Sequence, residues 1–206
     1  MSARLALIDY GAGNLRSVEN ALRAAGATDI VVTADPDAVR TADRIVLPGV
    51  GAFGHCRDQL GAIPGMIETL DDKVRKGGAP FLGICVGMQL MATRGEEHGV
   101  HQGLDWIGGT VKEMSAADPG IRIPHMGWND VVTATGAPLV EPGEAYYLHS
   151  YHFIADDPSD VLATSDHGGS IVAAVGRANM IGVQFHPEKS QAYGLALLAR
   201  FLEWKP

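Results

Sequence analysis

The chain has 206 residues, of which 46% are hydrophobic, and its formal net charge at pH 7 is −8. This composition is typical of a globular protein, and the scattered basic residues disfavour binding to nucleic acid or to an anionic membrane, which needs clustered Lys and Arg. No apolar run approaches the ~18–20 residues that cross a bilayer, and the N-terminal apolar stretch reaches Asp9 too early for a signal peptide. We expect a cytoplasmic protein with a single domain over residues 1–206, because no linker divides the chain.

The first half of the chain alternates short apolar strands with segments of helical periodicity. The expected strands are 4–9, 29–33, 43–49 and 79–84, and the expected helices are 15–26, 63–78 and 86–93. Strands that alternate with helices are typical of βαβ units. We therefore predict an α/β fold with an open, mostly parallel central sheet and helices on both faces.

From Trp106 to Val183 the pattern changes to short strands joined by turns. The segments are WIGGTVKEM, IRIPHMGW, DVVTAT, EAYYLHS, YHFIA, VLATSD, SIVAAVG and MIGVQF. Such closely spaced strands predict an antiparallel or mixed extension of the sheet. An amphipathic helix, 191–204, is expected to close the chain.

One cysteine, Cys85, stands between two glycines where the fourth strand meets a helix. The stretch 83–87 fits G-x-C-x-G, the cysteine form of a nucleophile elbow, in which small flanking residues let strand and helix approach closely. In such a turn the backbone N–H of Val86 points toward the reacting carbonyl, and the helix N-terminus favours a thiolate. A free cysteine in an apolar strand is also commonly a buried hydrophobic residue, so the motif alone leaves both interpretations open.

The histidine best placed to serve as a base is His186. It follows an apolar strand in MIGVQFHPEKS, and Glu188 lies two residues later, on the same side of an extended backbone. The Glu188 carboxylate can bind one imidazole nitrogen and leave the other for a thiol, as the acid of a catalytic triad does. Since Cys85 and His186 both end strands, at the edge where open α/β sheets bind ligands, we predict a Cys85–His186–Glu188 triad.

The glycine-rich turn PGVGAFG (48–54) follows the third strand. Its glycines allow positive φ and close approach of the backbone to a ligand. Such a loop can supply a second N–H donor to an oxyanion hole, beside that of Val86. A glycine-rich turn without a function is the alternative interpretation.

Other motifs do not predict a metal or cofactor site. The stretches HGVH (98–101) and HSYH (149–152) have H-x-x-H spacing, but no carboxylate or thiol cluster completes a set of four ligands. The stretch DYGAGNLRS (9–17) follows a strand and opens a helix, but Arg16 stands where a dinucleotide loop has its third glycine. We expect no metal and no cofactor.

Together these motifs resemble the class I (triad-type) glutamine amidotransferases. GICVGMQ (83–89) is similar to the nucleophile motif of that family, and FHPE (185–188) to its His and Glu. The resemblance implies a flavodoxin-like fold and hydrolysis of L-glutamine to L-glutamate and ammonia through a thioester on Cys85. It also implies that His186 protonates the departing ammonia and then activates water, while Glu188 orients the imidazole.

Motifs outside the triad narrow the resemblance to one branch of the family. That branch supplies ammonia to a separate cyclase (synthase) subunit, which makes imidazole glycerol phosphate and the aminoimidazole carboxamide ribotide in histidine biosynthesis. The similar stretches, found between residue 8 and about residue 195, are DYGAGNLRSV, LPGVGAFG, IPHMGWN, YYLHSY and VQFHPEKS. The resemblance implies a heterodimer with that cyclase, and binding features for a sugar phosphate are absent from this sequence, as a separate synthase chain requires.

At matching positions the resemblance implies further site residues. Val50 and Gly51 would lie on an oxyanion loop whose peptide rearranges when the partner binds. Gln89 and the backbone of Ser150 and Tyr151 would hold the α-amino and carboxylate groups of glutamine. The residues that would dock the synthase and gate ammonia passage are Asn14, Trp128, Tyr146 and Lys189.

Two mild departures from the family pattern and several alternative functions remain. Ala12 stands where the loop of the family varies. Val86 stands where Leu is usual, but it would contribute to the oxyanion hole through its backbone, so activity is not put in doubt. A class I amidotransferase for anthranilate, aminodeoxychorismate or guanylate synthesis is disfavoured by HMGWN and YYLHSY. A noncatalytic flavodoxin-like module would keep Cys85 in its core, and a peptidase or stress-protein hydrolase is disfavoured by the His-Pro-Glu spacing.

Overall fold

Two sheets organise the computed structural model, which describes residues 3–115 and 120–206. The larger sheet has nine strands in the order β2-β1-β3-β4-β13-β12-β11-β8-β9, and the smaller has four in the order β10-β7-β5-β6. The strands are β1 (Arg4–Ile8), β2 (Asp29–Thr33), β3 (Arg44–Gly49), β4 (Phe81–Cys85), β5 (Arg94–Gly95), β6 (His101–Gln102), β7 (Gly109–Glu113), β8 (His125–Thr133), β9 (Gly143–His149), β10 (Tyr151–Ala155), β11 (Val161–Asp166), β12 (Ser170–Arg177) and β13 (Met180–Val183).

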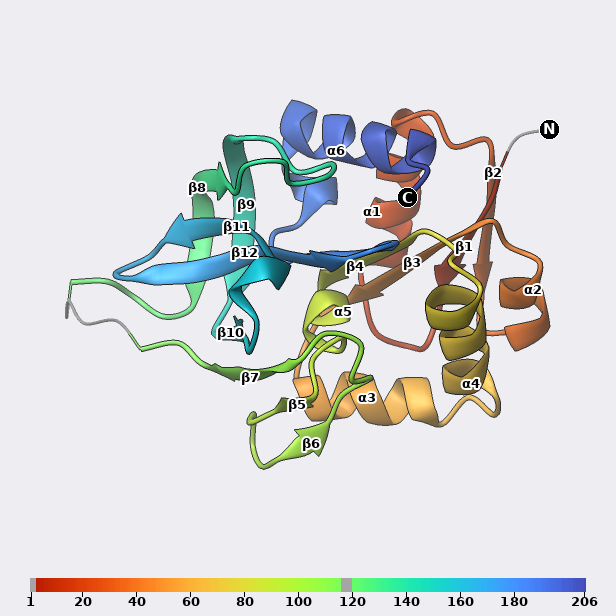
Figure 1. The fold of residues 1–206 in the computed structure, drawn as a ribbon, viewed down its shortest axis with the longest axis horizontal. Coiled ribbons are helices and arrows are strands. Elements are labelled where there is room, and N and C mark those ends of the chain that lie inside the picture. The colour runs from red at the N-terminus through yellow and green to blue at the C-terminus, as the bar shows by residue number, and fades with distance from the viewer. Residues whose placement is uncertain (1–2, 116–119) are drawn as a thin grey trace.

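The half of the large sheet formed by β2, β1, β3, β4 and β13 is parallel throughout. Its strands β3 and β4 are buried along their whole length, as parallel strands covered on both faces must be. Figure 1 shows α1 and α6 on one face and α3 and α4 on the other. The helices are α1 (Leu15–Ala24), α2 (Pro36–Arg40), α3 (Phe53–Gly61), α4 (Met66–Leu70), α5 (Val86–Gln89) and α6 (Gln191–Glu203). The predicted α/β architecture is confirmed.

The other half of the large sheet, formed by β12, β11, β8 and β9, is antiparallel, as the turn-rich second half of the sequence predicts. Along β8, exposed residues alternate with more buried ones, which is typical of a sheet with one face open to solvent. The exposed positions include Met126, Trp128 and Val132. This half therefore presents apolar side chains on an uncovered face.

Several elements differ from the sequence-based expectations. The expected strands 121–128 and 130–135 form the single strand β8, and the expected helix 86–93 ends at Gln89. The expected helix 63–78 begins at Met66, because Gly65 has a φ of 77° that no helix accommodates, and it continues as a π-helical segment, Asp71–Lys76. The helices α2 and α3 and the strands β5 and β6 are too short or too weakly periodic to stand out in the sequence.

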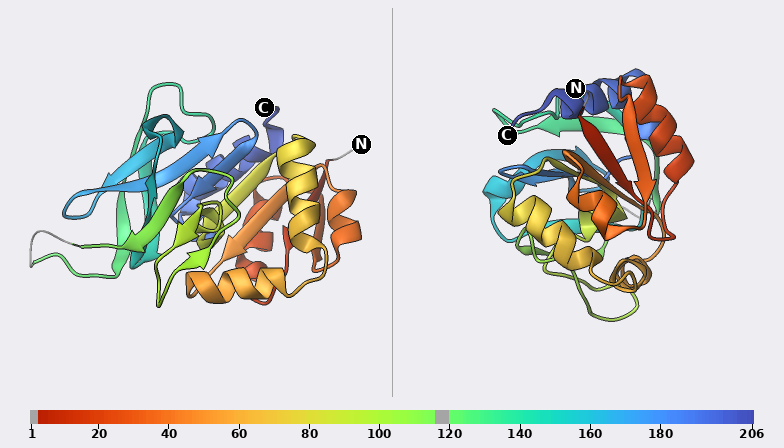
Figure 2. Two further views of the ribbon diagram at one scale, coloured as in Figure 1. Left: turned by 60° about the horizontal axis from the view of Figure 1, so that its bottom comes forward. Right: turned by 90° about the vertical axis from the view of Figure 1, so that its right-hand side faces the viewer.

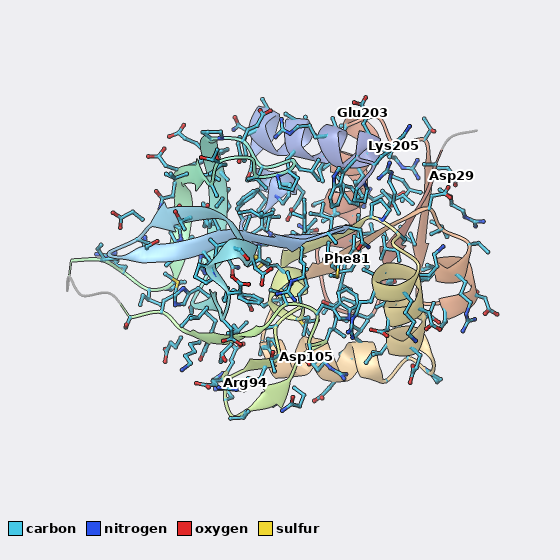
Figure 3. The ribbon with its side chains drawn as sticks, viewed as in Figure 1. Asp29, Phe81, Arg94, Asp105, Glu203 and Lys205 are labelled. Atoms are coloured by element: carbon cyan, nitrogen blue, oxygen red, sulfur yellow. The ribbon has the colours of Figure 1, made fainter. Side chains whose placement is uncertain are left out.

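The β5–β6 end of the small sheet lies beside α3, as Figure 2 shows, and β6 contacts that helix directly. Figure 3 places Phe81 in the interior of the molecule, where its ring meets that of Trp106 edge to face at 4.9 Å. The charged residues labelled in that figure, such as Asp29 and Lys205, lie at the periphery. Within the described residues, no helix has the length and apolar character needed to span a membrane.

The register of the parallel strands brings three predicted motifs to one edge. Gly49, the last residue of β3, lies opposite Cys85, the last residue of β4, and Val183 of β13 lies opposite Ile84. Since the carboxyl ends of parallel strands share an edge, the glycine-rich loop, the cysteine turn and the His-Pro-Glu segment converge there.

Candidate active site

The thiol of Cys85 lies on a strained strand-to-helix turn. β4 ends at Cys85, α5 begins at Val86, and Cys85 has a φ of 54°. A positive φ costs a residue with a Cβ on the order of 1–3 kcal/mol, so the surrounding structure must hold the turn in place. This is the backbone geometry that the GICVG motif predicts.

The two glycines of the motif are required by close backbone contacts. A Cβ at Gly87 would lie 1.9 Å from the carbonyl oxygen of Leu47 in β3, and a Cβ at Gly83 would lie 2.7 Å from the carbonyl oxygen of Gly87. A larger residue at either position would push the helix away from the sheet. The glycines therefore fix the position from which Cys85 projects.

The imidazole of His186 is held by Glu188. Its Nδ1–H donates to Glu188 Oε1 at 2.9 Å, and both side chains are almost fully buried. The contact forms in a short 3₁₀ turn, Pro187–Lys189, and not along a continued strand as the sequence interpretation assumed. Proline suits the first position of such a turn because its missing N–H is not needed there. The Nε2 of His186 is left to face the thiol.

The electrostatics of His186 favour the protonated ring. Burial lowers the pKa of His186, but hydrogen bonds with Cys85 and Glu188, together with the negative charge of both groups, raise it to about 10. A protonated imidazole beside a thiol favours the thiolate, which is the nucleophilic form of cysteine. The arrangement is thus suited to a thiolate–imidazolium pair.

A pocket of about 240 Å³ opens over Cys85. It is smaller than the roughly 300–1,000 Å³ of pockets for drug-sized ligands, so it suits a ligand the size of an amino acid. The predicted site residues that line it are Val50, Gly51, Cys85, Val86, Gln89, Ser150, Tyr151, His186 and Lys189. Glu188 does not line this pocket and contacts the site through its hydrogen bond with His186.

The loop after β3 lies against the nucleophile turn and is held by two buried donors. The hydroxyl of Tyr10 donates to the carbonyl oxygen of Pro48 at 2.7 Å, and the thiol of Cys56 donates to that of Val50 at 3.3 Å. Burial raises the pKa of Cys56 to about 11, so its thiol stays protonated. Cys56 and Cys85 are both free cysteines: Cys56 holds the loop after β3, and Cys85 lies at the turn between β4 and α5.

Gln89 connects the pocket to the backbone of Tyr151. Its Nε2 donates to the Tyr151 carbonyl oxygen at 3.1 Å and to Gln184 Oε1 at 3.0 Å. Because both hydrogens of this amide are used, its Oε1 is the atom left to accept from a ligand.

Three of the four residues predicted for the partner interface lie together. Trp128 and Tyr146 are opposite each other on β8 and β9, with ring centroids 6.1 Å apart, and Lys189 Nζ lies 5.9 Å from the Tyr146 ring centroid. Asn14 lies at the exposed start of α1. The hydrogen bonds and ring contacts of the described residues do not link Asn14 to the other three.

Three residues at the pocket were not predicted from the sequence. Glu97 lines the pocket, and its carboxylate accepts the backbone N–H of Phe53 at 2.7 Å. Gln184 is fully buried, and its Nε2 donates to the sulfur of Cys85 at 3.6 Å. His149 also lines the pocket. Gln184 had a usable signal: a polar residue inside an apolar strand, two residues before His186, must find a buried partner on that side.

The two H-x-x-H pairs are not part of metal clusters in the described structure. Over residues 3–115 and 120–206, no group of three or more His, Cys, Asp or Glu side chains is arranged to hold a metal ion.

The sequence matches the family model described as glutamine amidotransferase class-I over residues 6–204. The chain is 60% identical over 208 residues to the imidazole glycerol phosphate synthase subunit HisH of Zymomonas mobilis, covering 100% of this chain and 98% of that protein. It is 54% identical to the subunit of the same name from Rhodospirillum rubrum, covering 98% of this chain and 100% of that protein.

Solved structures of more distant proteins share the fold. A crystal structure of a glutamine amidotransferase superposes with a TM-score of 0.73 at 18% identity, covering 96% of this chain and 97% of that one. The structure of PurLQS from Thermotoga maritima includes a chain that superposes with a TM-score of 0.72 at 18% identity, covering 98% of each. At these identities the likeness concerns the fold alone.

Proposed function

The chain belongs to the class I glutamine amidotransferases, and from that premise we propose that it hydrolyses L-glutamine to L-glutamate and ammonia. The observation that carries the proposal is the strained turn that presents Cys85 to an imidazole held by Glu188. We further propose that the ammonia passes to a separate cyclase chain, in keeping with the synthase named for its relatives. Their joint products are imidazole glycerol phosphate and the aminoimidazole carboxamide ribotide of histidine biosynthesis.

The proposed reaction proceeds in two halves on Cys85. The thiolate attacks the side-chain carbonyl of glutamine, and the resulting oxyanion is met by the backbone N–H of Val86 and by the loop at Val50 and Gly51. The C–N bond breaks as His186 gives its proton to the departing nitrogen, which leaves as ammonia. The neutral His186 then takes a proton from water, the water oxygen attacks the thioester, and glutamate leaves as the thiolate re-forms.

The pocket has groups suited to bind the α-ammonium and α-carboxylate groups of glutamine. Gln89 Oε1 and the Glu97 carboxylate are acceptors suited to the α-ammonium group, and both residues line the pocket. The backbone of Ser150 and Tyr151, at the end of β9 and the start of β10, is suited to the α-carboxylate. These contacts orient the side-chain amide toward Cys85.

The open face of β8 and β9 is the proposed docking surface for the cyclase in a heterodimer. Met126 and Leu148 lie opposite each other there, 65% and 38% exposed, beside the Trp128–Tyr146 pair. Exposed apolar side chains gathered on one face are typical of protein interfaces. Trp128, Tyr146, Lys189 and Asn14 are the residues proposed to contact the partner and to gate ammonia.

We also propose that the chain acts in the cytoplasm as one glutaminase domain over residues 1–206. It would need no cofactor and no metal, and it would bind neither nucleic acid nor membrane, in keeping with its net charge of −8.

The test is Cys85→Ala in the complex with the cyclase. Glutamine-dependent synthesis is expected to vanish, while added ammonium salt still supports the cyclase reaction, because only the nucleophile is removed. Glutamine hydrolysis that persists in this variant would refute the assignment.

A glutamine-analogue alkylator is expected to label Cys85 and to spare Cys56, and peptide mapping distinguishes the two.

A second measurement tests the partner. Glutamine turnover by the isolated chain is expected to be far below its turnover with the cyclase, because the loop at Val50 is proposed to rearrange on docking. Equal turnover with and without the cyclase would contradict that part of the proposal and leave the glutaminase assignment standing.

A further inference from the structure

We propose that Gln184 is a further catalytic residue, whose side-chain amide donates to the Cys85 sulfur and is positioned by a buried chain of hydrogen bonds through His149 and His125. The inference rests on the proposed function in one respect, the role of Cys85 as the nucleophile. It adds a donor to the thiolate and a positioning role for two histidines that the triad does not use.

The side-chain amide of Gln184 can face the sulfur of Cys85 only through its nitrogen. The side chain is fully buried, and its Nε2 lies 3.6 Å from Cys85 Sγ. Its Oε1 accepts from Gln89 Nε2 at 3.0 Å, so the oxygen cannot be the atom that faces the thiol. An N–H donor strengthens when its acceptor carries charge, so the contact stabilises the thiolate more than the thiol.

The orientation of Gln89 is fixed in turn by a backbone carbonyl. Gln89 Nε2 donates to the Tyr151 carbonyl oxygen at 3.1 Å, and a carbonyl oxygen can only accept. The same nitrogen supplies the hydrogen that Gln184 Oε1 receives. Any change that frees the Tyr151 carbonyl therefore loosens both amides.

The Tyr151 carbonyl also accepts from His149, and this contact sets the tautomers of two rings. His149 Nδ1 lies 2.9 Å from the carbonyl oxygen and must donate to it. The bare Nε2 of a neutral His149 then accepts from His125 Nδ1 at 3.1 Å. His125 Nε2 is consequently an acceptor, and Asn129 Nδ2 supplies its hydrogen at 3.1 Å. The second hydrogen of that amide goes to the Asp166 carbonyl oxygen at 2.8 Å.

The rings of His125 and His149 are both neutral, as these hydrogen bonds require, because each ring must have one nitrogen that accepts. Burial lowers the pKa of His125 to about 4 and the pKa of His149 to about 3, and neighbouring histidines add to both effects. The groups that face the pair are other rings. His167 and Tyr147 stack on His125, with ring centroids 4.0 Å and 4.5 Å away, and the nearby His152 lowers the pKa of His149 further. Each neutral ring has one donor and one acceptor, so the hydrogen bonds can run in one direction only.

This series of hydrogen bonds thus connects β8 with Cys85, and it starts on the side of β8 opposite to the open face that carries Trp128. It begins at Asn129, next to Trp128, and reaches Cys85 through groups whose donors and acceptors are matched at every contact. The links between His125 and His149, between Gln89 and Gln184, and between Gln184 and Cys85 are buried, so breaking any of these three leaves an unsatisfied polar group.

The first test compares Gln184→Met with the wild type. Methionine has a similar length and lacks the N–H, and Gln102→Met, on exposed β6, is the matched control. The rate of Cys85 alkylation by iodoacetamide at pH 7 is expected to fall about tenfold or more in Gln184→Met alone, as expected for loss of a hydrogen bond to a charged group. An alkylation rate equal to that of the wild type would overturn the proposal.

This test is separable from that of the proposed function. Iodoacetamide needs no glutamine, so the rate reports on the thiolate whatever the substrate is. If the wild-type complex hydrolysed no glutamine, the proposed function would fail, and a lowered alkylation rate in Gln184→Met would still support the donor.

The second test compares His149→Asn with His149→Leu. Asparagine can place its Nδ2 near the position of the histidine Nδ1 and keep a donor for the Tyr151 carbonyl, whereas leucine cannot. The rates of alkylation and of glutamine hydrolysis are expected to fall several-fold in the Leu variant and to recover in the Asn variant. Folded variants that lose activity equally, or not at all, would overturn the positioning role. If the Leu variant does not fold, His149→Gln replaces it, because its longer side chain moves the amide away from the position of the histidine Nδ1. A several-fold loss in His149→Gln with wild-type rates in His149→Asn would support the role, and equal rates in these two variants would overturn it.

Discussion

Two buried histidine sites in this molecule have opposite electrostatics. His186, at the carboxyl edge of the parallel strands, pairs with a carboxylate, and its pKa rises to about 10. His125 and His149, on the antiparallel strands β8 and β9, pair with each other, and their pKa values fall to about 4 and about 3. All three rings are less than a tenth exposed, so burial does not explain the difference.

The partner decides the charge of each ring. Burial penalises the charged form of every histidine, and only a negative partner offsets that penalty. Glu188 and Cys85 supply negative charge to His186, whereas His125 and His149 meet another ring, an amide and a carbonyl oxygen. The charged pair can move a proton, and the neutral pair can fix the direction of hydrogen bonds.

The largest expected effect comes from removing the negative partner. In Glu188→Gln, glutamine hydrolysis by the complex is expected to fall about 100-fold, the lower end of the range for general acid–base groups, because an amide can still bind Nδ1. The pKa of His186 should fall well below about 10, as an imidazole NMR titration would record. Glu141→Gln, which removes a carboxylate that is 65% exposed, is the control and should leave both quantities unchanged. An unaltered His186 titration in Glu188→Gln would contradict this account of the charged pair.

The converse substitution gives the neutral pair a carboxylate. Asn129 donates to His125 Nε2 at 3.1 Å, so Asn129→Asp places a negative acceptor where a donor was. The pKa of His125 is expected to rise from about 4 to roughly 6, in line with the effect of an adjacent opposite charge. NMR titration of the imidazole measures it, with Asn20→Asp on the exposed side of α1 as the control. A His125 that still titrates near 4 in Asn129→Asp would show that the partner does not decide its charge.

The smallest expected effect is on stability in acid. An unfolded histidine has a pKa of about 6.5, so below that pH the unfolded chain binds protons that folded His125 and His149 do not bind. The free energy of unfolding should therefore fall as the pH drops from 6.5 toward 4, by about 2 kcal/mol for one such group at pH 5. His186 does not add to this loss, because below pH 6.5 it is protonated in both states.

Urea unfolding at several pH values measures the acid effect. His125→Phe is expected to lose less stability between pH 6.5 and 5 than the wild type, whereas His55→Gln, at an exposed position, should follow the wild type. Identical pH dependence in His125→Phe and the wild type would mean that His125 is protonated in the folded chain.

Local patterns in the sequence were enough to predict the parallel strands and the turn at Cys85. Apolar runs separated by helical periods indicate β1 to β4, and the flanking glycines of GICVG indicate a tight strand-to-helix turn. The His186–Glu188 contact was also predictable, although it forms in a 3₁₀ turn, because two residues of separation keep the groups close in either conformation.

The contacts of Gln184 and the histidine pair were not predictable in the same way. His125 and His149 meet because β8 and β9 pair in the register that sets these two residues opposite each other, and Gln184 reaches Gln89 over a separation of 95 residues. A shift of one residue in that register would turn the rings to the other face. The sequence carries the residues, but their meeting depends on long-range pairing.

The sequence by itself determined the tight turn at Cys85 and the pairing of His186 with Glu188, because strand ends, glycines and short spacings are local features of the chain. Only the tertiary structure decided which buried histidines carry charge and which amide faces the thiol. The physical reason is that the charge of a ring and the direction of a hydrogen bond depend on partners that long-range strand pairing supplies.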